Sequence, residues 1–371
     1  MLFQAVAGAI ALVLLFAGVA VAAAFVSPAL LVATLAAYFT FGVGVSIYFV
    51  RVRPTRSLLA KDLSRLGRVM QLDEFFNKNY SETSVVAYYG NTTFRDYKLL
   101  AVATGSSAMH SALVPQRPVP FRNCGHLRQL LYVMAQMGDG VCGGRVLEVG
   151  FGKGTNTVYL ADLFPGASFT GIDITPEHVD WAQCWASRLG LSNATFLRDD
   201  ASAPTVSGPF NLMFGIESFC HLDTDDKLRG FLAFAQQQLA PGGRLVVVDG
   251  YRGSGFEGLP LEVRQAMQLA ESGFRIRRMA SKATWRALAE AAGLVLLDDL
   301  DLTKQALGFW TLGWRVAHVL LLLLPWAVRA YVCSGGAKHK ETGANFVAVA
   351  MTAFAMALGS AEYGVLVFKK P

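Results

Sequence analysis

The stretch VLEVGFGKGTNT at 146–157 combines glycines, a lysine and a carboxylate, residue types that could hold a charged ligand. A nucleotide-binding P-loop needs the pattern GxxxxGK[ST], but Lys153 is followed by Gly154 and the upstream glycine is missing. The dinucleotide fingerprint GxGxxG also fits poorly, because Thr155 stands where the third glycine should be. Glu148, directly before the loop, would repel a pyrophosphate, so the stretch favours a cationic ligand.

Strands and helices alternate around this loop and must position it. Short β-branched runs predict strands at 145–149, 168–173, 194–198, 210–216, 244–249 and 294–298. Helical stretches between them lie at 156–163, 176–189, 227–239 and 282–292. This alternation predicts an α/β fold with a mostly parallel sheet covered on both faces. Ligands of such sheets bind outside the carboxyl ends of the strands, which is where the glycine loop falls.

Four motifs occur in the order and spacing of a known family. The order Glu148-x-Gly150-x-Gly152-x-Gly154 resembles the first motif of class I S-adenosylmethionine-dependent methyltransferases. Three later stretches agree with this resemblance: TGIDIT at 170–175, RDDA at 198–201 and LAPGGRL at 239–245. The resemblance implies a Rossmann-like sheet of seven strands, whose last strand is antiparallel and corresponds here to 362–371.

S-adenosylmethionine is the cofactor that this resemblance implies. Glu148 would help to hold the amino end of its methionine part, and Asp173 would accept hydrogen bonds from the two ribose hydroxyls. Ile174 would pack on the adenine, and Asp200, followed by Ala201, would receive the adenine amino group. The predicted cofactor-binding residues are Glu148, Gly150, Gly152, Gly154, Asp173, Ile174, Asp200 and Ala201.

A second loop, FGIESFCHLD at 214–223, follows the fourth predicted strand and resembles the corresponding loop of sterol C-methyltransferases and γ-tocopherol methyltransferase-like enzymes. The resemblance directs attention to Glu217 and His221 as catalytic candidates. His221 could remove a proton from a hydroxyl or phenol acceptor, and Glu217 could stabilise the carbocation left when an alkene is methylated. Alternatively, Glu217 only contacts the cofactor and His221 only caps the next helix.

An aromatic pair precedes the sheet. The residues Val86-Ala87-Tyr88-Tyr89 resemble the helical lead-in of the same family, where a tyrosine pair borders cofactor and acceptor. Tyr88 and Tyr89 are therefore further catalytic candidates, although an aromatic stripe is also typical of a buried core. The chain shows no CxxC pair and no cluster of metal ligands, so no metal is expected.

The first fifty residues predict a membrane anchor. Hydrophobic residues make up 53% of the chain and charged residues 16%, and 1–50 contains no Lys, Arg, Asp or Glu. Two spans of about 20 residues fit, at 2–24 and 29–50, although a single span plus a re-entrant segment also fits. A signal peptide would need a preceding basic region, and none is present. Basic residues follow instead, beginning at Arg51, which predicts an integral membrane protein with its catalytic domain on the cytosolic side.

The predicted organisation has five parts. An anchor at 1–50 is followed by interfacial and substrate-side helices at 51–143, a methyltransferase core at 144–302, an apolar helical lid at 303–361 and the final strand at 362–371. The amphipathic stretch 57–71 suits either a helix on the membrane surface or a core helix. We expect the lid to touch the membrane rather than to cross it.

These features predict a membrane-anchored methyltransferase that acts on a lipid-soluble acceptor: a sterol, an isoprenoid, a quinol or another lipid. Two alternatives stay open: a methyltransferase of a polar amine or phospholipid head group, and a non-catalytic cofactor-binding protein. Scattered rather than clustered basic residues argue against a nucleic-acid partner. The oligomeric state has no sequence signature.

Overall fold

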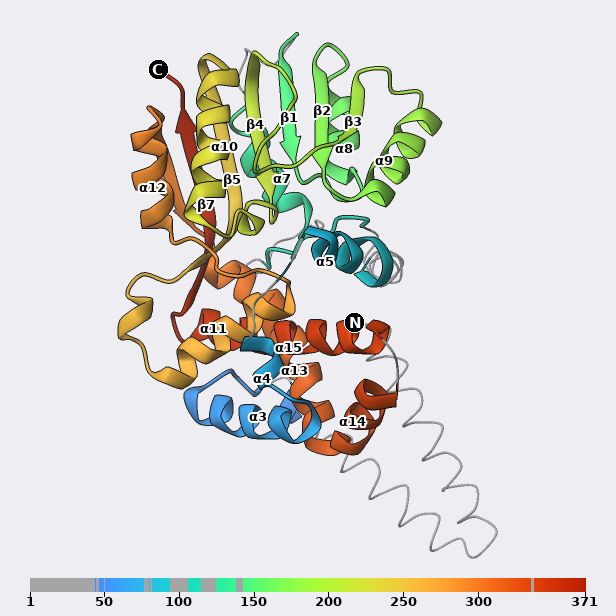
Figure 1. The fold of residues 1–371 in the computed structure, drawn as a ribbon, viewed down its shortest axis with the longest axis vertical. Coiled ribbons are helices and arrows are strands. Elements are labelled where there is room, and N and C mark those ends of the chain that lie inside the picture. The colour runs from blue at the N-terminus through green and yellow to red at the C-terminus, as the bar shows by residue number, and fades with distance from the viewer. Residues whose placement is uncertain are drawn as a thin grey trace, which may run out of the picture.

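A seven-stranded sheet and a group of helices form the two halves of the protein (Figure 1). The computed structural model describes residues 44, 47–49, 51–76, 80, 82–93, 106–114, 125–137, 143–334 and 337–371. The two predicted membrane spans lie almost wholly outside the described residues. Within those residues, the two halves meet along the carboxyl ends of the first strands.

The sheet has the strand order β3-β2-β1-β4-β5-β7-β6. Its strands are β1 (Arg145–Val149), β2 (Ser168–Asp173), β3 (Ala194–Arg198), β4 (Phe210–Ile216), β5 (Leu239–Arg252), β6 (Val295–Asp301) and β7 (Ala361–Lys369). Strands β1 to β5 pair in parallel, whereas β7 is antiparallel to both of its neighbours, β5 and β6. The predicted Rossmann-like sheet of seven strands with an antiparallel last strand is confirmed, and β5 is longer than predicted at both ends.

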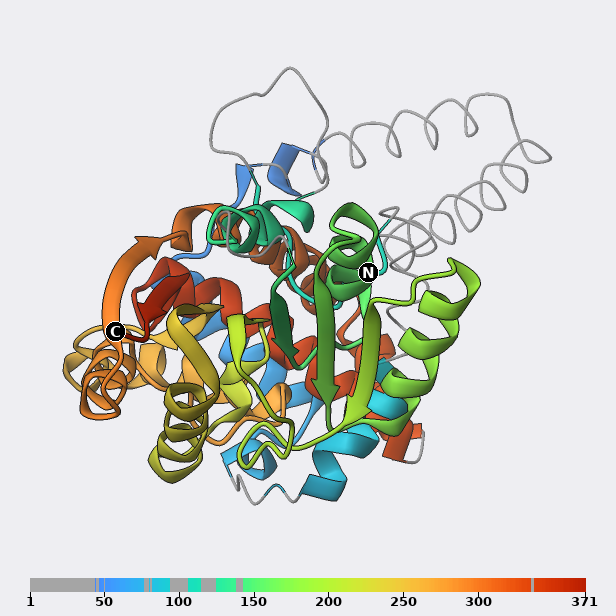
Figure 2. The ribbon, with the colours of Figure 1, turned by 90° about the horizontal axis from the view of Figure 1, so that it is seen from above.

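Helices cover both faces of the sheet (Figure 2). One face packs against α7 (Leu127–Met134), α8 (Thr155–Leu163) and α9 (Pro176–Arg188). The other face packs against α10 (Asp225–Gln238) and α12 (Lys282–Ala291). Alternating residues of β5 divide between the faces, because successive side chains of a strand point to opposite sides: Val246 and Val248 join the first core, and Leu245 and Val247 join the second.

The helical half combines segments that are far apart in the sequence. Its helices are α3 (Arg56–Val69), α4 (Asp73–Phe76), α11 (Leu261–Gly273), α13 (Thr303–Leu323), α14 (Pro325–Ser334) and α15 (Ala337–Ala357). A third core joins them, with Leu59 and Leu66 of α3 fully buried against residues such as Trp314 and Phe354. The stretch predicted at 57–71 is therefore a core helix in this structure. Helix α11 was not predicted.

Asp62 of α3 lies at the centre of the helical half. It is only 1% exposed, and it lies on the same side of the helix as the buried Leu59 and Leu66. Its carboxylate accepts hydrogen bonds from Nε1 of Trp314 at 3.1 Å and from Arg65 at 2.8 Å, and it lies 2.7 Å from Nδ1 of His318. The other ring nitrogen of His318 lies 2.7 Å from the hydroxyl of Tyr48. Because a buried carboxylate is stable only when its oxygens have partners, this network explains how Asp62 can be buried.

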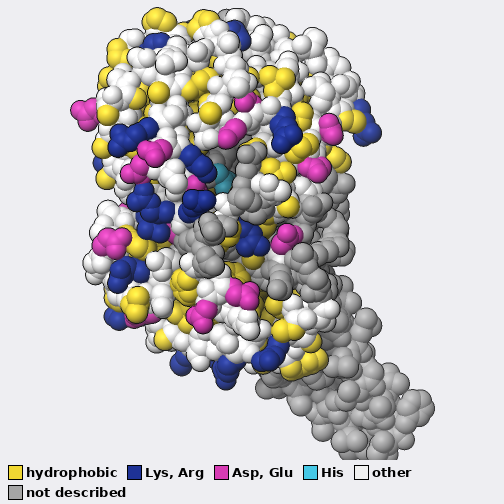
Figure 3. Space-filling view, viewed as in Figure 1, with side chains coloured by type: hydrophobic (Ala, Val, Ile, Leu, Met, Phe, Trp, Pro, Cys, Tyr) yellow, Lys and Arg dark blue, Asp and Glu magenta, His cyan; other side chains and the backbone are white. Residues whose placement is uncertain are grey.

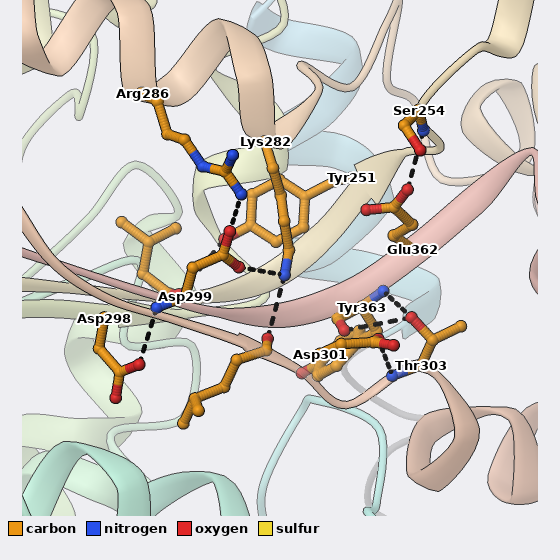
Figure 4. Close-up of polar contacts among 12 residues, drawn as sticks. Tyr251, Ser254, Lys282, Arg286, Asp298, Asp299, Asp301, Thr303, Glu362 and Tyr363 are labelled. Atoms are coloured by element: carbon orange, nitrogen blue, oxygen red, sulfur yellow. Dashed lines mark hydrogen bonds and ion pairs between the residues drawn. The ribbon is translucent and has the colours of Figure 1, made fainter.

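Polar contacts join α12 and the start of α13 to the last two strands at one side of the sheet (Figure 4). Lys282 of α12 donates to Asp299 of β6 at 2.6 Å, and Arg286 forms an ion pair with the same carboxylate. Thr303, the first residue of α13, donates its N–H to Asp301 at 2.9 Å and accepts from the N–H of Tyr363 on β7 at 2.9 Å. The start of α13 is thereby fixed to the edge strand β6 and to its neighbour β7.

Helix α13 is the one helix in the described part of the chain whose length and apolar composition would allow it to cross a membrane. It has 21 residues, and 39% of its most apolar 18-residue stretch is buried inside the protein. The core helix of a soluble protein can have the same length and apolar composition. Whether the region predicted as a lid contacts a membrane stays a prediction.

Candidate active site

The glycine loop turns sharply from β1 into α8. Gly150, Gly152 and Gly154 all have left-handed backbone angles, with φ of 69°, 56° and 75°. Neighbouring residues also leave no room for side chains, because a Cβ on Gly150 would lie 2.3 Å from Cβ of Ser218. A Cβ on Gly154 would lie 2.6 Å from Cβ of Ala182. Both the backbone conformation and the packing therefore require glycine here.

Asp173 ties the end of β2 to the glycine loop. The N–H of Gly152 donates to one of its carboxylate oxygens at 2.9 Å, and the N–H of Thr175 donates to the other at 2.9 Å. Nδ1 of His178 lies 3.1 Å from the same carboxylate, which is 9% exposed. The structure therefore brings together the predicted glycines and the predicted ribose-binding carboxylate. Its contact with ribose stays a prediction.

Glu148 lies beneath the loop and is 1% exposed. It accepts hydrogen bonds from Nδ2 of Asn156 at 3.0 Å and from the hydroxyl of Thr157, both in the first turn of α8. Burial raises the pKa of Glu148 to about 7, and these hydrogen bonds oppose the rise. In this arrangement Glu148 fixes the loop to α8. Its predicted contact with the amino end of the cofactor stays a prediction.

Asp200 follows β3 at the same edge of the sheet. Its carboxylate accepts from the N–H of Ser202 at 2.8 Å and from the hydroxyl of Ser202 at 2.7 Å, which holds the turn after the strand. Ile174 and Ala201 are both half-exposed. The predicted adenine-binding residues thus stand at the ends of two neighbouring strands, as the order of β2 and β3 requires.

Glu217 connects three segments that are distant in the sequence. Its φ of 51° is left-handed, which is uncommon for a residue other than glycine and often marks a functional site. Its carboxylate accepts from the N–H of Ser111 at 3.0 Å, from Nε2 of Gln129 at 3.2 Å and from the hydroxyl of Tyr363 at 2.9 Å. The hydroxyl of Ser111 also donates to it. Glu217 stays half-exposed, so a ligand can still reach it.

His221 and the tyrosine pair meet at the boundary of the two halves. The hydroxyl of Tyr89 lies 2.8 Å from Nε2 of His221, and the ring of Tyr88 stands edge-on to that of Tyr89 at 4.8 Å. Burial lowers the pKa of His221 to about 4, so the imidazole is neutral at pH 7 and able to accept a proton. Figure 3 shows a histidine at the bottom of a hollow between the two halves, with basic side chains beside it.

Asp249 supports the loop that carries His221. Its carboxylate accepts from the N–H of Cys220 at 3.0 Å and from the N–H of Gly250 at 2.7 Å. Burial raises the pKa of Asp249 to about 7. No sequence motif indicates a role for Asp249. Its contact with Cys220 exists only because β5 pairs with β4 in the folded sheet.

Three further site residues were missed by sequence reasoning: Ser111, Gln129 and Tyr363. Tyr363 lies in the predicted final strand. Because side chains alternate between the two faces of a strand, the register of this strand could have predicted that Tyr363 points toward the site. Ser111 and Gln129 had no comparable signal. In the described part of the chain, no group of three or more His, Cys, Asp or Glu residues is arranged to hold a metal ion.

The family described as "Methyltransferase domain" matches residues 146–243, which span the glycine loop, Asp173, Asp200 and the 214–223 loop. This region of the chain is similar to that family of methyltransferase domains. The prediction of a class I S-adenosylmethionine-dependent methyltransferase domain is confirmed by this match together with the observed strand order. The more specific resemblance to sterol and tocopherol enzymes is not confirmed.

Known proteins similar to the chain include two methyltransferases and a cyclase. The demethylmenaquinone methyltransferase of Tropheryma whipplei is 36% identical over 107 residues, which are 29% of this chain and 42% of that enzyme. The solved geranyl diphosphate C-methyltransferase of Streptomyces coelicolor has a TM-score of 0.59 at 16% identity, covering 78% of this chain and 98% of that one. The [4+2]-cyclase SpnF has a TM-score of 0.55 at 21% identity, covering 76% and 94%.

These similarities differ in what they establish. The chain spans between 7% and 57% of the length of the first curated relatives that it matches. The solved structures are too distant in sequence to indicate more than the fold. The cyclase has this fold and a different reaction in its name, so the activity of the whole protein has to be argued from its own site.

Proposed function

We propose that the protein is an S-adenosylmethionine-dependent methyltransferase whose acceptor is an apolar, lipid-soluble molecule. The observation that carries this proposal is the convergence of the glycine loop, Asp173 and the Tyr89–His221 pair at one edge of the sheet. The left-handed glycines give a loop whose backbone carries no side chains, and Asp173 holds a carboxylate against it, 2.9 Å from the N–H of Gly152. These residues fit S-adenosylmethionine, which supplies the methyl group when bound.

The chain's own residues would align the acceptor and move its proton. Methyl transfer is an in-line displacement, so most of the work is alignment of the reacting atoms. His221 is neutral at pH 7, because burial lowers its pKa to about 4, and it can accept the proton of a hydroxyl acceptor. Glu217 presents a half-exposed carboxylate held by several donors, which suits stabilisation of positive charge on an alkene-type acceptor.

An apolar acceptor is supported by the aromatic pair at the site and by similar proteins. Tyr89 lies against His221, and Tyr88 stands edge-on to Tyr89. The similar demethylmenaquinone methyltransferase and geranyl diphosphate C-methyltransferase are named for quinone and isoprenoid acceptors. These two names agree with the lipid-soluble acceptor that the apolar segment 1–50 suggests. We propose that this segment is a membrane anchor and that the catalytic domain lies on the cytosolic side.

The test uses purified full-length protein in non-ionic detergent, methyl-labelled S-adenosylmethionine and a total lipid extract from the source cells. After incubation, the label is partitioned between organic and aqueous phases, with His221→Ala as the matched control. Enzyme-dependent label in the organic phase that falls in the control supports the proposal. Label confined to an added polar amine would overturn the apolar acceptor and favour the head-group or amine alternative. Cofactor binding without any turnover would favour a non-catalytic protein.

A further inference from the structure

A cavity of about 500 Å³ lies inside the helical half, between α3, α4, α11 and α14 and the start of α15. This volume is within the usual range for small-molecule sites. Its apolar walls include Val69, Met70, Phe75 and Val332. The described contacts of the methyltransferase site do not use any of these residues.

Three guanidinium groups line this cavity: Arg68, Arg275 and Arg329. Among the described residues, none of them forms an ion pair, and Arg329 only donates to the backbone oxygen of Arg68 at 3.0 Å. The single carboxylate in the lining is Glu74, so positive charge is in excess. Arg68 and Arg329 are exposed and Arg275 is half-buried, so guanidinium groups at the cavity are accessible to an anion from solvent.

Arg275 connects the cavity to the tyrosine pair. Its guanidinium carbon lies 5.7 Å from the ring centroid of Tyr80 and 5.7 Å from that of Tyr88. Its φ of 61° is left-handed, a strained backbone that persists only where surrounding structure enforces it. Tyr88 in turn stands against Tyr89, so the tyrosine pair separates the cavity from His221. The cavity is thus a compartment next to the methyltransferase site and distinct from it.

The rim of the cavity exposes aromatic surface. Trp326 is 70% exposed and precedes the lining residues Arg329 and Cys333 by three and seven positions, so all three share one face of α14. Indole beside arginine is a common arrangement where protein meets the head groups of lipids. A ligand here would meet exposed arginine side chains together with apolar surface.

We propose that this cavity binds the anionic head, a phosphate or a carboxylate, of a membrane amphiphile whose apolar chain leaves along Trp326. This site goes beyond the proposed methyl transfer and does not depend on it. A free phosphate ion shares the head-group chemistry, but it would gain nothing from the apolar walls or from Trp326.

The test measures binding to the full-length protein in non-ionic detergent by calorimetry. The three probes are dihexanoyl phosphatidic acid, dihexanoyl phosphatidylcholine and inorganic phosphate. We expect the phosphatidic acid to bind at least about tenfold more tightly than either of the others. Equal binding of inorganic phosphate would overturn the amphiphile in favour of a free-anion site, and equal binding of the phosphatidylcholine would overturn the role of the negative charge.

Variants locate the binding. Replacing both Arg68 and Arg329 with Gln should weaken phosphatidic acid binding by about tenfold or more, whereas the matched exposed pair Arg188→Gln and Arg229→Gln should leave it unchanged. If the double variant is unstable, the single variant Arg68→Gln, which changes an exposed residue, is measured in its place. Thermal unfolding followed by circular dichroism verifies that each variant is folded. Unchanged binding in the arginine variants would overturn the assignment to this cavity. Neither readout requires methyl transfer, so failure here and failure of the proposed function are separable.

Discussion

The two halves of the protein each contain a carboxylate joined to several donors, and the two differ in what surrounds them. Asp62 in the helical half is 1% exposed, and its partners Trp314 and His318 come from a single helix, α13. Glu217 at the carboxyl edge of the sheet is half-exposed and has a left-handed backbone. A buried, fully partnered carboxylate organises packing, whereas an accessible one held in a strained conformation is available to a ligand. We therefore expect the chemistry in the sheet half, at Glu217 and its neighbours, whereas Asp62 belongs to a structural polar core of the helical half.

The largest effect is expected from Asp173→Ala, which acts only on the sheet half. Removing the carboxylate eliminates the acceptor for Gly152 and the predicted acceptor for the ribose hydroxyls. We expect S-adenosylmethionine affinity to fall on the order of a thousandfold, because two charge-assisted hydrogen bonds are lost. Calorimetry measures this, with exposed Asp180→Ala on α9 as the control. Unchanged affinity would show that the register of β2 does not place Asp173 at the cofactor.

Asp62→Ala should act only on the helical half. The change leaves the indole N–H of Trp314, the ring of His318 and Arg65 without their shared acceptor in the core. Breaking one side of a buried charged network costs about 3–5 kcal/mol. Hydrogen exchange should then accelerate in peptides from α3, α13 and α15 and stay unchanged in β1 and β4. Equal acceleration in both halves would break the comparison, because the protein would then open as one unit.

His221→Ala tests the boundary between the halves, where His221 meets Tyr89. We expect turnover to fall roughly a hundredfold, the usual contribution of a general base, with cofactor affinity nearly unchanged. The parent should also lose kcat/KM as the pH falls through about 4, since protonation of His221 removes the base. If the variant has the same turnover as the parent, and the same loss of kcat/KM at low pH, His221 is excluded from the mechanism.

Asp249→Asn should change how the stability of the sheet half depends on pH. Burial raises the pKa of Asp249 from 3.8 to about 7, so the folded protein holds its proton longer than the unfolded chain does. The stability that this group contributes is present below pH 4 and is lost as the pH rises through 7. When the pH is raised from 5 to 8, the free energy of unfolding should fall by about 2 kcal/mol less in the variant than in the parent. Urea unfolding at both pH values measures this, and identical losses in the two proteins would contradict it.

The strands of the sheet half were predictable because their pattern is local. Strands β1 to β4 begin and end at the predicted residues, since buried β-branched runs between turn residues are read directly from the sequence. Helix α11 was missed although Val263, Ala266 and Ala270 repeat with helical spacing and are buried. Its partners in the third core come from both ends of the chain, and no local pattern indicates such packing.

The candidate site was predictable to a similar extent and for the same reason. Gly150, Asp173 and His221 follow strands and lie where parallel strands end, so motif order was enough to bring them together. The donors to Glu217 come from segments separated from it by 88 to 146 positions. The polar partners of Asp62 could not be predicted for the same reason, because Trp314 and His318 lie 252 and 256 positions from it in the sequence.

The position of β7 has a consequence for the order of folding during synthesis. This strand lies between β5 and β6 but is translated after both of them, and after the whole of α13 to α15. Until Ala361–Lys369 leaves the ribosome, β5 and β6 cannot be neighbours in the sheet and each presents an unpaired edge. Tyr363 also reaches Glu217 only at that moment. A nascent chain can therefore assemble β1 to β4 early, whereas the contact between Tyr363 and Glu217 forms only after α13 to α15 have been made.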